Sequence, residues 1–495
     1  MRDIVKSKQM FVPSILEQKC LWNYPVERVD NSPHVSMLIT ALPAKDCINQ
    51  RRLSMNEHLD TGSGFLFKGN RYFSQKSHGS QRSKPPSETL SEIKELLIAA
   101  GVTRLADITG LDKIGVPVTL AIRPTSRTIA VSSGKGVDLV TAMTSGAMES
   151  LELHHAEFAK LDYIYCTYSE LTQAHNCLRT EELPLRSGEA FNARWPETWT
   201  LGWDIVNQQE VAVPIQAALM APNLTEVRFP SIAAFVTDSN GLASGNDIVE
   251  AVLSGLLETI ERDAIALHKI RSEISGSLVG KINVATVPYE SVQRLKSRIE
   301  RSGARLALFD CTSDTKVPTF RAAILNDARG VGQIVEGFGT HLSNEMAMLR
   351  AITEACQGRA VVIAGARDDV FHFALERVAK ADYRRSIAAI DDQQMLQFHP
   401  HPESISNYIH KDLNSALHLL QEVNVTQVIV VELKMFDCEQ TFVKVIVPGL
   451  EGYPGSGYRP RRRALSLTRN LSRSEGNSSG LKSTLFHSQA GGNHG

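Results

Sequence analysis

The stretch GNDIVEAVLSGLLETIE, residues 245–261, repeats an earlier stretch of the same chain, GVDLVTAMTSGAMESLE, residues 136–152, without a gap. Eight of the 17 aligned positions are identical. A weaker third copy, SNEMAMLRAITEACQ, occupies residues 343–357. A stretch that recurs in this way predicts one structural unit built three times.

Each copy has the pattern of an α-helix. The residue in front of each first turn is of a type that caps helix starts, namely Asp138, Asp247 and Ser343. Apolar residues then follow at helical spacing. In the middle copy they cover most of the circumference, which predicts a buried helix.

One stripe along each of the first two helices carries only serine and glutamate. At about 100° per residue, Ser254, Glu258 and Glu261 fall within a narrow sector. The matching residues of the first copy are Ser145, Glu149 and Glu152. On the third helix Arg350 takes the place of the serine, and Glu354 takes the place of the first glutamate.

The two acidic stripes predict a site for a metal and a nucleotide. Carboxylates on a buried helix are costly unless a cation meets them. Four carboxylates on two facing helices favour Mg²⁺, which prefers oxygen ligands and usually shares them with substrate phosphates. The expected metal ligands are Glu149, Glu152, Glu258 and Glu261. The alternative is a solvated stripe, but such a face normally mixes Lys and Arg with its acids.

Other motifs bear on the nature of the site. No GxxxxGK[ST] sequence is present, so a P-loop is excluded. Lys135 lies between two glycines just before the first acidic helix, where it would meet a phosphate or belong to a plain turn. His154 and His155 point about 100° apart on a helix, so we expect a packed or surface role rather than a shared metal. Cys311 and Cys356 are expected to be buried structural thiols.

The composition is that of an ordinary globular protein. The chain has 495 residues, and 53 Lys and Arg against 54 Asp and Glu give a net charge of −1. That balance supplies no field for a phosphate backbone, so a nucleic-acid partner is not expected. No stretch approaches the ~20 apolar residues of a membrane span. Seven scattered cysteines without a CxxC pattern favour a reducing compartment. We therefore expect a cytoplasmic protein with no membrane partner.

Helices and strands are predicted to intermix, which favours a mixed α/β architecture. A helix is expected from Ser87 to Gly101. Strands are expected at residues 116–124, 128–131, 305–312, 317–325, 428–433 and 441–449, the last four as two pairs. Residues 61–86 have the composition of a loop, and the basic run 459–463 that of a solvated surface. Residues 466–495, rich in Ser, Gly and Asn, are expected to be a disordered tail.

These segments resemble the YcaO family. DSNGLASGNDIVEAVLSGLLETIERDA at 238–264 is similar to its central signature, and SSGKGVDLVTAMTSGAMESLELHHAE at 132–157 to the preceding one. GFGTHLSNEMAMLRAITEACQGR at 337–359 is similar to the third signature, and VPGLEGY at 447–453 to the closing segment of many members. The resemblance implies a YcaO-type fold over residues 66–465, with Glu-rich Mg-ATP helices packed on mixed sheets. Residues 1–65 would be an extension of unknown role.

The resemblance also implies which residues bind the cofactors. YcaO proteins bind Mg²⁺-ATP through glutamate-bearing helices of this kind. Carried over to this chain, the motif residues are Ser145, Glu149, Glu152, Ser254, Glu258, Glu261, Arg350 and Glu354, and Lys135 joins them as an expected nucleotide contact. Arg350 and Glu354 are the expected catalytic residues. Arg350 would stabilise the transferred phosphoryl group, or else form a salt bridge with Glu354 one turn away.

In the family, ATP activates a peptide backbone amide. A nucleophile adds to the carbonyl carbon, the resulting oxyanion is phosphorylated, and phosphate leaves. A neighbouring Cys, Ser or Thr side chain gives an azoline, whereas external sulfide gives a thioamide, usually with a TfuA-type partner. The chain lacks the Pro-x-Pro-x-Pro end of many azoline-forming members. The segment ETLSEIKELLIAAGVTRLADITGLDKIGVPV at 88–118 is more similar to TfuA-associated members, so thioamide formation is favoured.

The implied substrate is a ribosomally made peptide or protein. Because no peptide-clamping domain is evident, a separate recruiting protein is expected. Two alternatives stay open: an accessory protein that supports another enzyme, such as one for ribosomal-protein methylthiolation, and a non-catalytic protein whose acidic cluster holds a structural cation. A homodimer is left open as well.

Overall fold

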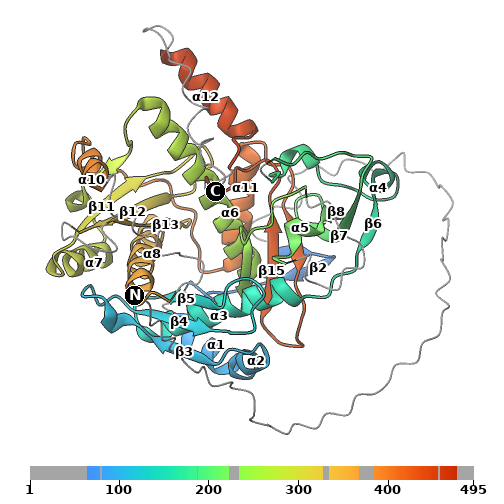
Figure 1. The fold of residues 1–495 in the computed structure, drawn as a ribbon, viewed down its shortest axis with the longest axis horizontal. Helices are drawn as coiled ribbons and strands as arrows, with labels where there is room; N and C mark the ends of the chain where they lie inside the picture. The colour runs from blue at the N-terminus through green and yellow to red at the C-terminus, as the bar shows by residue number, and fades with distance from the viewer. Residues whose placement is uncertain are drawn as a thin grey trace, which may run out of the picture. The chain divides into compact units, whose positions relative to one another are not determined.

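A computed structural model of the chain describes residues 64–78, 81–186, 188–221, 234–326, 334–366, 383–454 and 458–475. Contacts divide the chain into two units, Met1–Arg52 and Leu53–Gly495, and every described residue belongs to the second unit. Helices and strands alternate through it, so the expected mixed α/β class is confirmed (Figure 1). The expected extension at 1–65 lies outside the described residues apart from residues 64 and 65.

Within the described residues the strands form four sheets, and every strand pair in them is antiparallel. The three-stranded sheet has the order β3 (Arg104–Asp107), β4 (Val118–Ile122), β5 (Val131–Lys135). The four-stranded sheet has the order β10 (Lys281–Ile282), β11 (Arg305–Asp310), β12 (Thr319–Leu325), β13 (Ile334–Thr340). The largest sheet has the order β6 (Ile164–Thr167), β7 (Pro196–Asp204), β14 (Ile429–Glu432), β15 (Thr441–Ile446), β9 (Leu242–Gly245), with β8 (Gln209–Pro214) beside β7. The fourth sheet is the hairpin of β1 (Phe65–Phe67) and β2 (Asn70–Tyr72).

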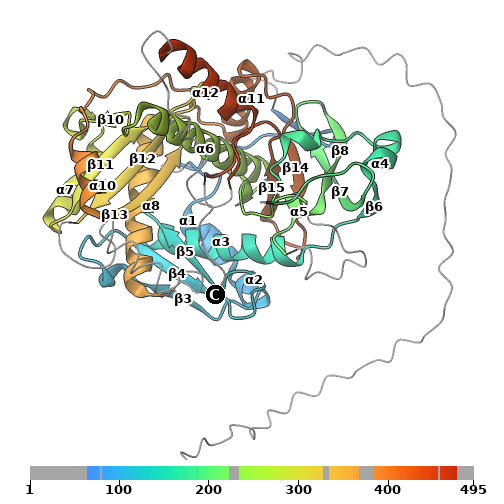
Figure 2. The ribbon, with the colours of Figure 1, turned by 45° about the horizontal axis from the view of Figure 1, so that its top comes forward.

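Each acidic helix lies on a different one of the three larger sheets. The helix α3 (Leu139–Phe158) follows β5, α6 (Ile248–Ser275) follows β9, and α8 (Asn344–Ala364) follows β13; each contacts the strand that it follows. Each also contacts a strand that precedes another of the three helices: α3 contacts β9, α6 contacts β13 and α8 contacts β5. The three copies of the repeat therefore close a ring of contacts, and Figure 2 shows each helix beside its sheet.

Glycines let these helices approach their strands closely. A Cβ added to Gly134 on β5 would lie 2.0 Å from the carbonyl oxygen of Ala142 and 2.3 Å from the amide nitrogen of Gly146. A Cβ added to Gly255 on α6 would lie 2.7 Å from Cγ2 of Val445. Helix and strand backbones are thus nearly in contact, which a side chain at either position would prevent. This packing fixes the direction in which each acidic stripe points.

The expected helix caps are present in two of the three copies. The side chain of Asp138 accepts from the Thr141 amide at 2.8 Å, and that of Asp247 from the Glu250 amide at 2.9 Å. Ser343 occupies the predicted N-cap position of α8, but its side chain makes no capping bond. Instead the Glu403 carboxylate, 59 positions from Asn344, accepts from the Asn344 amide at 2.6 Å. An acceptor that far along the chain gives no local pattern.

The middle helix is buried, as its apolar circumference predicts. Its residues Val249, Leu256 and Ile260 belong to a core that also contains β15 and α11 (Ile409–Glu422). Ala243 of β9 packs in this core, whereas Leu242 packs in the core of α3. The helices α3 and α6 therefore cover opposite faces of the same sheet edge. The other described α-helices are α1 (Pro86–Glu92), α2 (Lys94–Ala99), α4 (Tyr168–Ala174), α5 (Ile215–Ala218), α7 (Glu290–Arg301), α10 (Tyr383–Asp391) and α12 (Arg462–Glu475).

Most of the predicted strands are confirmed. The two predicted pairs are β11 with β12 and β14 with β15. The strand predicted at 116–124 is β4, and the short strand predicted at 128–131 begins only at Val131. Its start is delayed because the Glu157 carboxylate holds the amides of Arg127 and Thr128.

Two predictions at the N-terminal side need correction. The helix expected from Ser87 to Gly101 is interrupted at Ile93, which separates α1 from α2. The loop expected at 61–86 contains the β1–β2 hairpin, so that prediction is wrong for 65–72. Phe65 and Phe67 are buried in the α6 core, and their burial stabilises a hairpin that the surrounding Gly, Ser and Lys residues conceal in the sequence.

The C-terminal segment differs most from its expectation. Residues 462–475 form α12, so the prediction of a disordered tail is wrong for 466–475, and the rest of the tail lies outside the described residues. Ala464 packs with Leu267 and Ile270 of α6, and Leu467 packs against this cluster.

The basic run 459–463 is not a solvated surface at every position. Arg459 and Arg462 are exposed, but Arg461 and Arg463 are not. Arg461 donates to the Glu182 carbonyl at 2.5 Å. Arg463 donates to both carboxylate oxygens of Asp263 at 2.8 and 2.9 Å. The prediction failed because the acidic and carbonyl partners come from distant segments.

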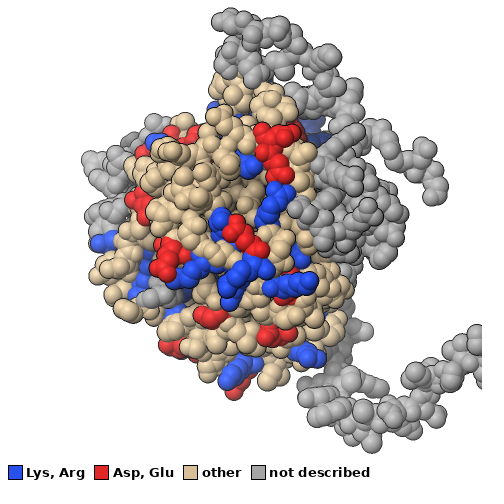
Figure 3. Space-filling model, turned by 90° about the vertical axis from the view of Figure 1, so that its left-hand side faces the viewer, with Lys and Arg blue, Asp and Glu red and all other residues tan. Residues whose placement is uncertain are grey.

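The remaining expectations concern packing. The ring of His155 stacks on Phe442 with centroids 3.7 Å apart, and that of His154 on Phe436 at 5.3 Å, so their packed role is confirmed. Cys311 and Cys356 are buried free thiols, as expected. Among the described helices none is long and apolar enough to cross a membrane. On the face drawn in Figure 3, basic and acidic side chains are interspersed, in keeping with a net charge of −1.

Candidate nucleotide and magnesium site

Glutamates from all three acidic helices interact with one another. Glu152 on α3 experiences the negative charge of Glu258 on α6, and Glu258 experiences that of Glu354 on α8. The negative charge of Glu354 acts on Glu261 as well. We call this cluster of carboxylates the acidic recess, a name that denotes the cluster and not a cavity, and its members are Glu149, Glu152, Glu258, Glu261 and Glu354. The ring of strands and helices brings together carboxylates that lie more than 200 residues apart in the sequence.

Three of these carboxylates are held in their neutral form more strongly than usual. Burial, with smaller contributions from Glu149 and Glu258, raises the pKa of Glu152 to about 8, although the Ser244 hydroxyl donates to it at 2.6 Å. Burial also raises the pKa of Glu261 to about 7, with Glu354 adding to it. Burial and the charge of Glu354 raise the pKa of Glu258. Burial thus outweighs the cations and donors that surround these three carboxylates.

The recess is reached from solvent. The side chain of Glu258 is 24% exposed and that of Glu354 28% exposed, whereas Glu261 retains 5%. Ser145, Glu149 and Glu152 are all half-buried on α3. A ligand can therefore contact these oxygens without unfolding the helices.

Glu354 differs from the other members because it has cationic partners. Burial opposes its ionisation, but the charges of Lys135 and Arg262, with the Phe338 amide, hold its pKa below the usual value. Lys135 donates to Glu354 at 2.5 Å, and the Phe338 amide at 3.2 Å. Lys135 belongs to the end of β5 and not to a turn. Its ammonium group therefore faces the recess, where the sequence placed a phosphate contact.

Arg350 has no ion pair with Glu354 within the described residues, because Lys135 occupies that carboxylate. The positive charge of Arg350 instead lowers the pKa values of Glu258 and Glu261 against the larger effect of burial. Its buried Nε has no hydrogen-bond acceptor among the described residues. A buried N–H without an acceptor is costly, so this donor is suited to an anionic ligand.

Sequence reasoning missed two arginines at this site. Arg262 contacts Glu258 at 3.5 Å and Glu261 at 3.8 Å, and its guanidinium lies 5.3 Å from the centre of the Tyr453 ring. Although burial opposes it, the neighbouring glutamates raise the pKa of Arg262. The sequence offered a usable signal, because Arg262 lies four residues after Glu258 and this spacing on a helix predicts a contact.

The other missed residue is Arg82, which comes from a segment with the composition of a loop. It donates to the Ser254 hydroxyl at 2.9 Å and to Glu250 at 3.1 Å. Its charge also lowers the pKa of Glu152 against the larger effect of burial. No periodic pattern surrounds Arg82, so the sequence offered no signal for its place beside the acidic helices.

The acidic recess fits a divalent cation in charge but does not form a finished metal cage. Among the described residues no group of three or more His, Cys, Asp or Glu is arranged to hold a metal by itself. Mg²⁺ is usually bound by one or two carboxylates plus phosphate oxygens and water, so a complete cage is not required. Burial raises the pKa values of Glu152, Glu258 and Glu261 although nearby cations oppose it, and a bound divalent cation would favour their charged forms.

Comparison with known proteins gives consistent matches. The family model described as YcaO cyclodehydratase, ATP- and Mg²⁺-binding, matches residues 133–451. A protein in the tfuA 3′ region of Rhizobium leguminosarum bv. trifolii is 33% identical over 379 residues, which cover 75% of this chain and 88% of that protein. The family model covers all three copies of the acidic repeat, and the relative covers most of the chain.

Two solved structures are similar in fold. The structure of YcaO from Methanopyrus kandleri, bound with AMPPCP and Mg²⁺, matches with a TM-score of 0.61 and 24% identity over 77% of this chain and 96% of that one. A heterocyclase in complex with substrate and cofactor matches with a TM-score of 0.67 and 20% identity over 81% of this chain. This chain spans 56% of the heterocyclase.

Proposed function

The chain belongs to the YcaO family, whose cofactors are the expected ATP and Mg²⁺, and from that premise we propose that it activates a backbone amide of a ribosomally made peptide or protein. We further propose that external sulfide replaces the activated oxygen, so that the product is a thioamide. Azoline formation by a neighbouring Cys, Ser or Thr side chain is the alternative outcome of the same activation.

One observation carries the proposal for the site. Glu152, Glu258 and Glu261 come from two helices, share one recess and have pKa values raised by burial. A buried carboxylate whose pKa stays raised despite neighbouring cations takes up either a proton or a further cation. A divalent cation between α3 and α6 would compensate several of these carboxylates at once, and its remaining coordination positions would be filled by phosphate oxygens and water.

The proposed roles follow from where the residues lie. Glu149, Glu152, Glu258 and Glu261 would hold Mg²⁺, and Lys135, Ser145, Ser254, Arg350 and Glu354 would contact the nucleotide. Bound Mg²⁺-ATP supplies the phosphoryl group that turns the amide oxygen into a leaving group. Arg350 would donate its uncommitted Nε hydrogen to a phosphoryl oxygen. Glu354 would keep the ammonium group of Lys135 beside the phosphates through their 2.5 Å ion pair.

The preference for a thioamide rests on similarity. The relative in the tfuA 3′ region is 33% identical over most of its length. Since TfuA-type proteins accompany thioamide-forming members of the family, we propose a TfuA-like partner for this chain. We also propose that a recruiting protein delivers the peptide, and that the reaction takes place in the cytoplasm.

Mass spectrometry of a peptide co-expressed with this chain and a TfuA-like protein tests the proposal. Exchange of the amide oxygen for sulfur adds about 16 Da, whereas azoline formation removes about 18 Da. An unmodified peptide, together with intact Mg²⁺-dependent ATP hydrolysis, would favour the accessory role. Calorimetry that shows metal binding without ATP binding would favour the non-catalytic cation-binding protein.

A further inference from the structure

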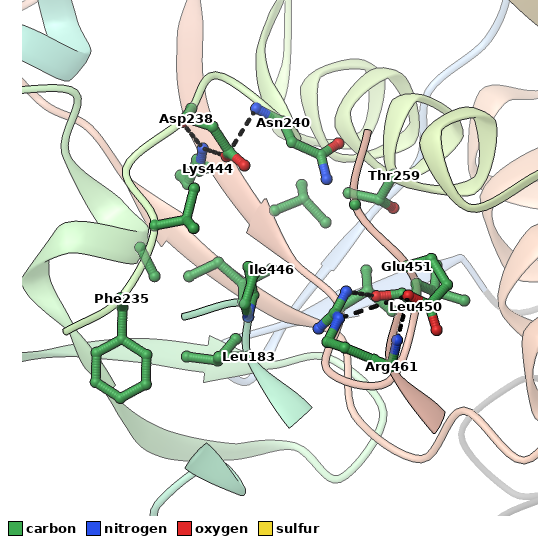
Figure 4. A pocket seen from close by; sticks show the side chains of 16 residues that line it. Leu183, Phe235, Asp238, Asn240, Thr259, Lys444, Ile446, Leu450, Glu451 and Arg461 are labelled. Carbon is green, nitrogen blue, oxygen red and sulfur yellow. Dashed lines mark hydrogen bonds and ion pairs between the residues drawn. The ribbon is translucent and has the colours of Figure 1, made fainter. Parts of the chain in front are cut away.

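A second recess lies beside the acidic recess and has no part in the nucleotide site described above. Its empty volume, part of which is open solvent, is about 560 Å³. Most of its lining comes from residues 235–240 before β9, residues 444–447 of β15 and its end, and residues 450–452 with Arg461 after β15. We call it the β15 recess. Figure 4 shows the apolar side chains of Leu183, Phe235 and Ile446 between two polar ends.

One polar end is used up by the fold itself. Arg461 donates to the carbonyl oxygens of Glu182 and Leu450 and lies 3.8 Å from the carboxylate of Glu451. Glu451 in turn accepts from the hydroxyl of Tyr458 at 2.8 Å and from the amide of Ala464 at 3.0 Å. These contacts anchor the start of α12, so this end of the β15 recess is structural.

The other polar end has a donor to spare. Lys444 is 4% exposed in the middle of β15, where a charged side chain is costly. Its ammonium group carries three donors. Within the described residues its contacts are to the carbonyl oxygen of Asp238 and, at 3.4 Å, to the carboxylate of the same residue. One donor thus remains for a ligand in the recess.

Lys444 also links the β15 recess to the acidic recess. The positive charge of Lys444 favours the ionised form of Glu258, and the negative charge of Glu258 favours the protonated form of Lys444. Thr259, the residue next to Glu258 on α6, lines the β15 recess. The β15 recess therefore adjoins the part of α6 that carries Glu258, one of the carboxylates proposed to hold Mg²⁺.

Taken together, these features fit one residue of an extended peptide. Apolar walls suit an apolar side chain, and a single buried cation at one end suits a carbonyl oxygen. We propose that the β15 recess is the subsite for the substrate peptide: it takes an apolar side chain, and Lys444 donates to the carbonyl oxygen of the same residue. The inference rests on the proposed function for the statement that this oxygen is the one to be phosphorylated.

Photo-crosslinking to the full chain tests this subsite. The probe is N-acetyl-photoleucine N-methylamide, which carries an apolar diazirine side chain and two amide groups. We expect its label on residues of the β15 recess, such as Phe235 and Ile446, and we expect an excess of N-acetyl-leucine N-methylamide to remove it. N-acetyl-glutamate N-methylamide should compete at least tenfold less well, because the walls are apolar. A label elsewhere, or equal competition by both compounds, overturns the inference.

Matched variants locate the contacts. Val236 lines the recess and is half-buried, so Val236→Trp should fill it and reduce labelling at least tenfold, whereas Val236→Ala should leave labelling intact. Lys444→Met should weaken labelling and Lys444→Arg should retain more of it. Melting curves show whether each variant is folded. If Val236→Trp does not fold, the Lys444 pair still decides the matter, because equal labelling of Met and Arg variants would overturn the role of the cation.

The outcome is separable from that of the proposed function. Binding of Mg²⁺-ATP, measured by calorimetry, should be unchanged in Val236→Trp. Labelling of the recess in a protein that binds no ATP would contradict the proposed function alone. ATP binding without labelling would contradict the subsite alone. An azido-ATP label on Phe235 would show that the recess takes the adenine base, which also overturns the inference.

Discussion

Two glutamates of the same helix, Glu152 and Glu157, show opposite ways of placing a carboxylate below a protein surface. Glu157 is fully buried, and it accepts from Arg123 at 2.7 Å and from the Thr128 amide at 3.0 Å. Burial opposes its ionisation, but these donors hold its pKa below the usual value. Glu152 accepts from the Ser244 hydroxyl and faces two further carboxylates, and burial raises its pKa to about 8.

The difference separates a structural acid from one that is prepared for a ligand. The fold surrounds Glu157 with a guanidinium group and two backbone amides, so the negative charge of its carboxylate is compensated within the protein. In the acidic recess burial raises the pKa values of Glu152, Glu258 and Glu261 although the charges of neighbouring arginines oppose it. A cation from solution is the natural complement. Neutralising Glu157 should therefore lower the stability of the protein. Neutralising a glutamate of the acidic recess should instead weaken cofactor binding.

The largest effect is expected from Glu157→Gln. Arg123, which is 1% exposed, would lose its counter-ion, and breaking a buried pair costs about 3–5 kcal/mol. We expect the free energy of unfolding, measured with urea, to fall by that amount while the folded fraction still binds Mg²⁺-ATP. The exposed Glu290→Gln serves as the control. A loss below about 1 kcal/mol would mean that the pair is not the structural acid described here.

The next effect is that of Glu258→Gln on ATP hydrolysis. Removing one carboxylate ligand should lower Mg²⁺-dependent hydrolysis by roughly 100-fold, which corresponds to about 2.7 kcal/mol. The melting temperature should stay within the range of the Glu290→Gln control. Unchanged hydrolysis in a folded Glu258→Gln protein would remove the acidic recess from the mechanism.

A smaller effect of opposite sign is expected for Glu152→Gln. In the absence of Mg²⁺, the substitution replaces a half-buried, poorly compensated acid by a neutral side chain of the same shape. The free energy of unfolding should rise by about 1–2 kcal/mol at neutral pH, allowing for solvent screening. Urea denaturation in EDTA measures it. A marked loss of stability would place Glu152 with Glu157 among the structural acids.

The dependence of stability on pH sharpens the same contrast. The pKa of Glu157 in the fold lies below its ordinary value of 4.5, so its contribution is complete above pH 4.5 and is lost as the pH falls through the lowered pKa. The pKa of Glu152 lies at about 8, so its penalty grows as the pH rises from 4.5 towards 8. The difference between wild type and Glu157→Gln should therefore shrink in acid, and that between wild type and Glu152→Gln should shrink below pH 5. With rising pH, Glu157 should therefore add stability and Glu152 should remove it. Urea denaturation at a series of pH values measures both contributions.

The sequence predicted the parts of the fold that have a local signature. The repeat, the helical spacing and the aspartate caps were sufficient to find α3, α6 and α8. The cap of α8 by Glu403 and the anchoring of Arg463 by Asp263 join distant segments, and no spacing rule reveals such pairs.

The same limit applies to the candidate site. The glutamates could be selected from their stripe, but Arg82 and Lys444 could not, because neither belongs to a helical pattern. Arg82 lies in a stretch with the composition of a loop, and Lys444 interrupts an apolar strand in which a charge looks like a surface position. Only the packing of β15 against the segment at Asp238 shows that this lysine is buried.

The most direct test of the account is the place of the metal. Crystals of the full chain grown with Mn²⁺ and a non-hydrolysable ATP analogue would give an anomalous difference peak at the metal. We predict a peak within about 2.0–2.4 Å of carboxylate oxygens from both α3 and α6, drawn from Glu149, Glu152, Glu258 and Glu261, with phosphate oxygens completing the coordination. A metal peak elsewhere in the protein, with none beside these four carboxylates, would contradict the account.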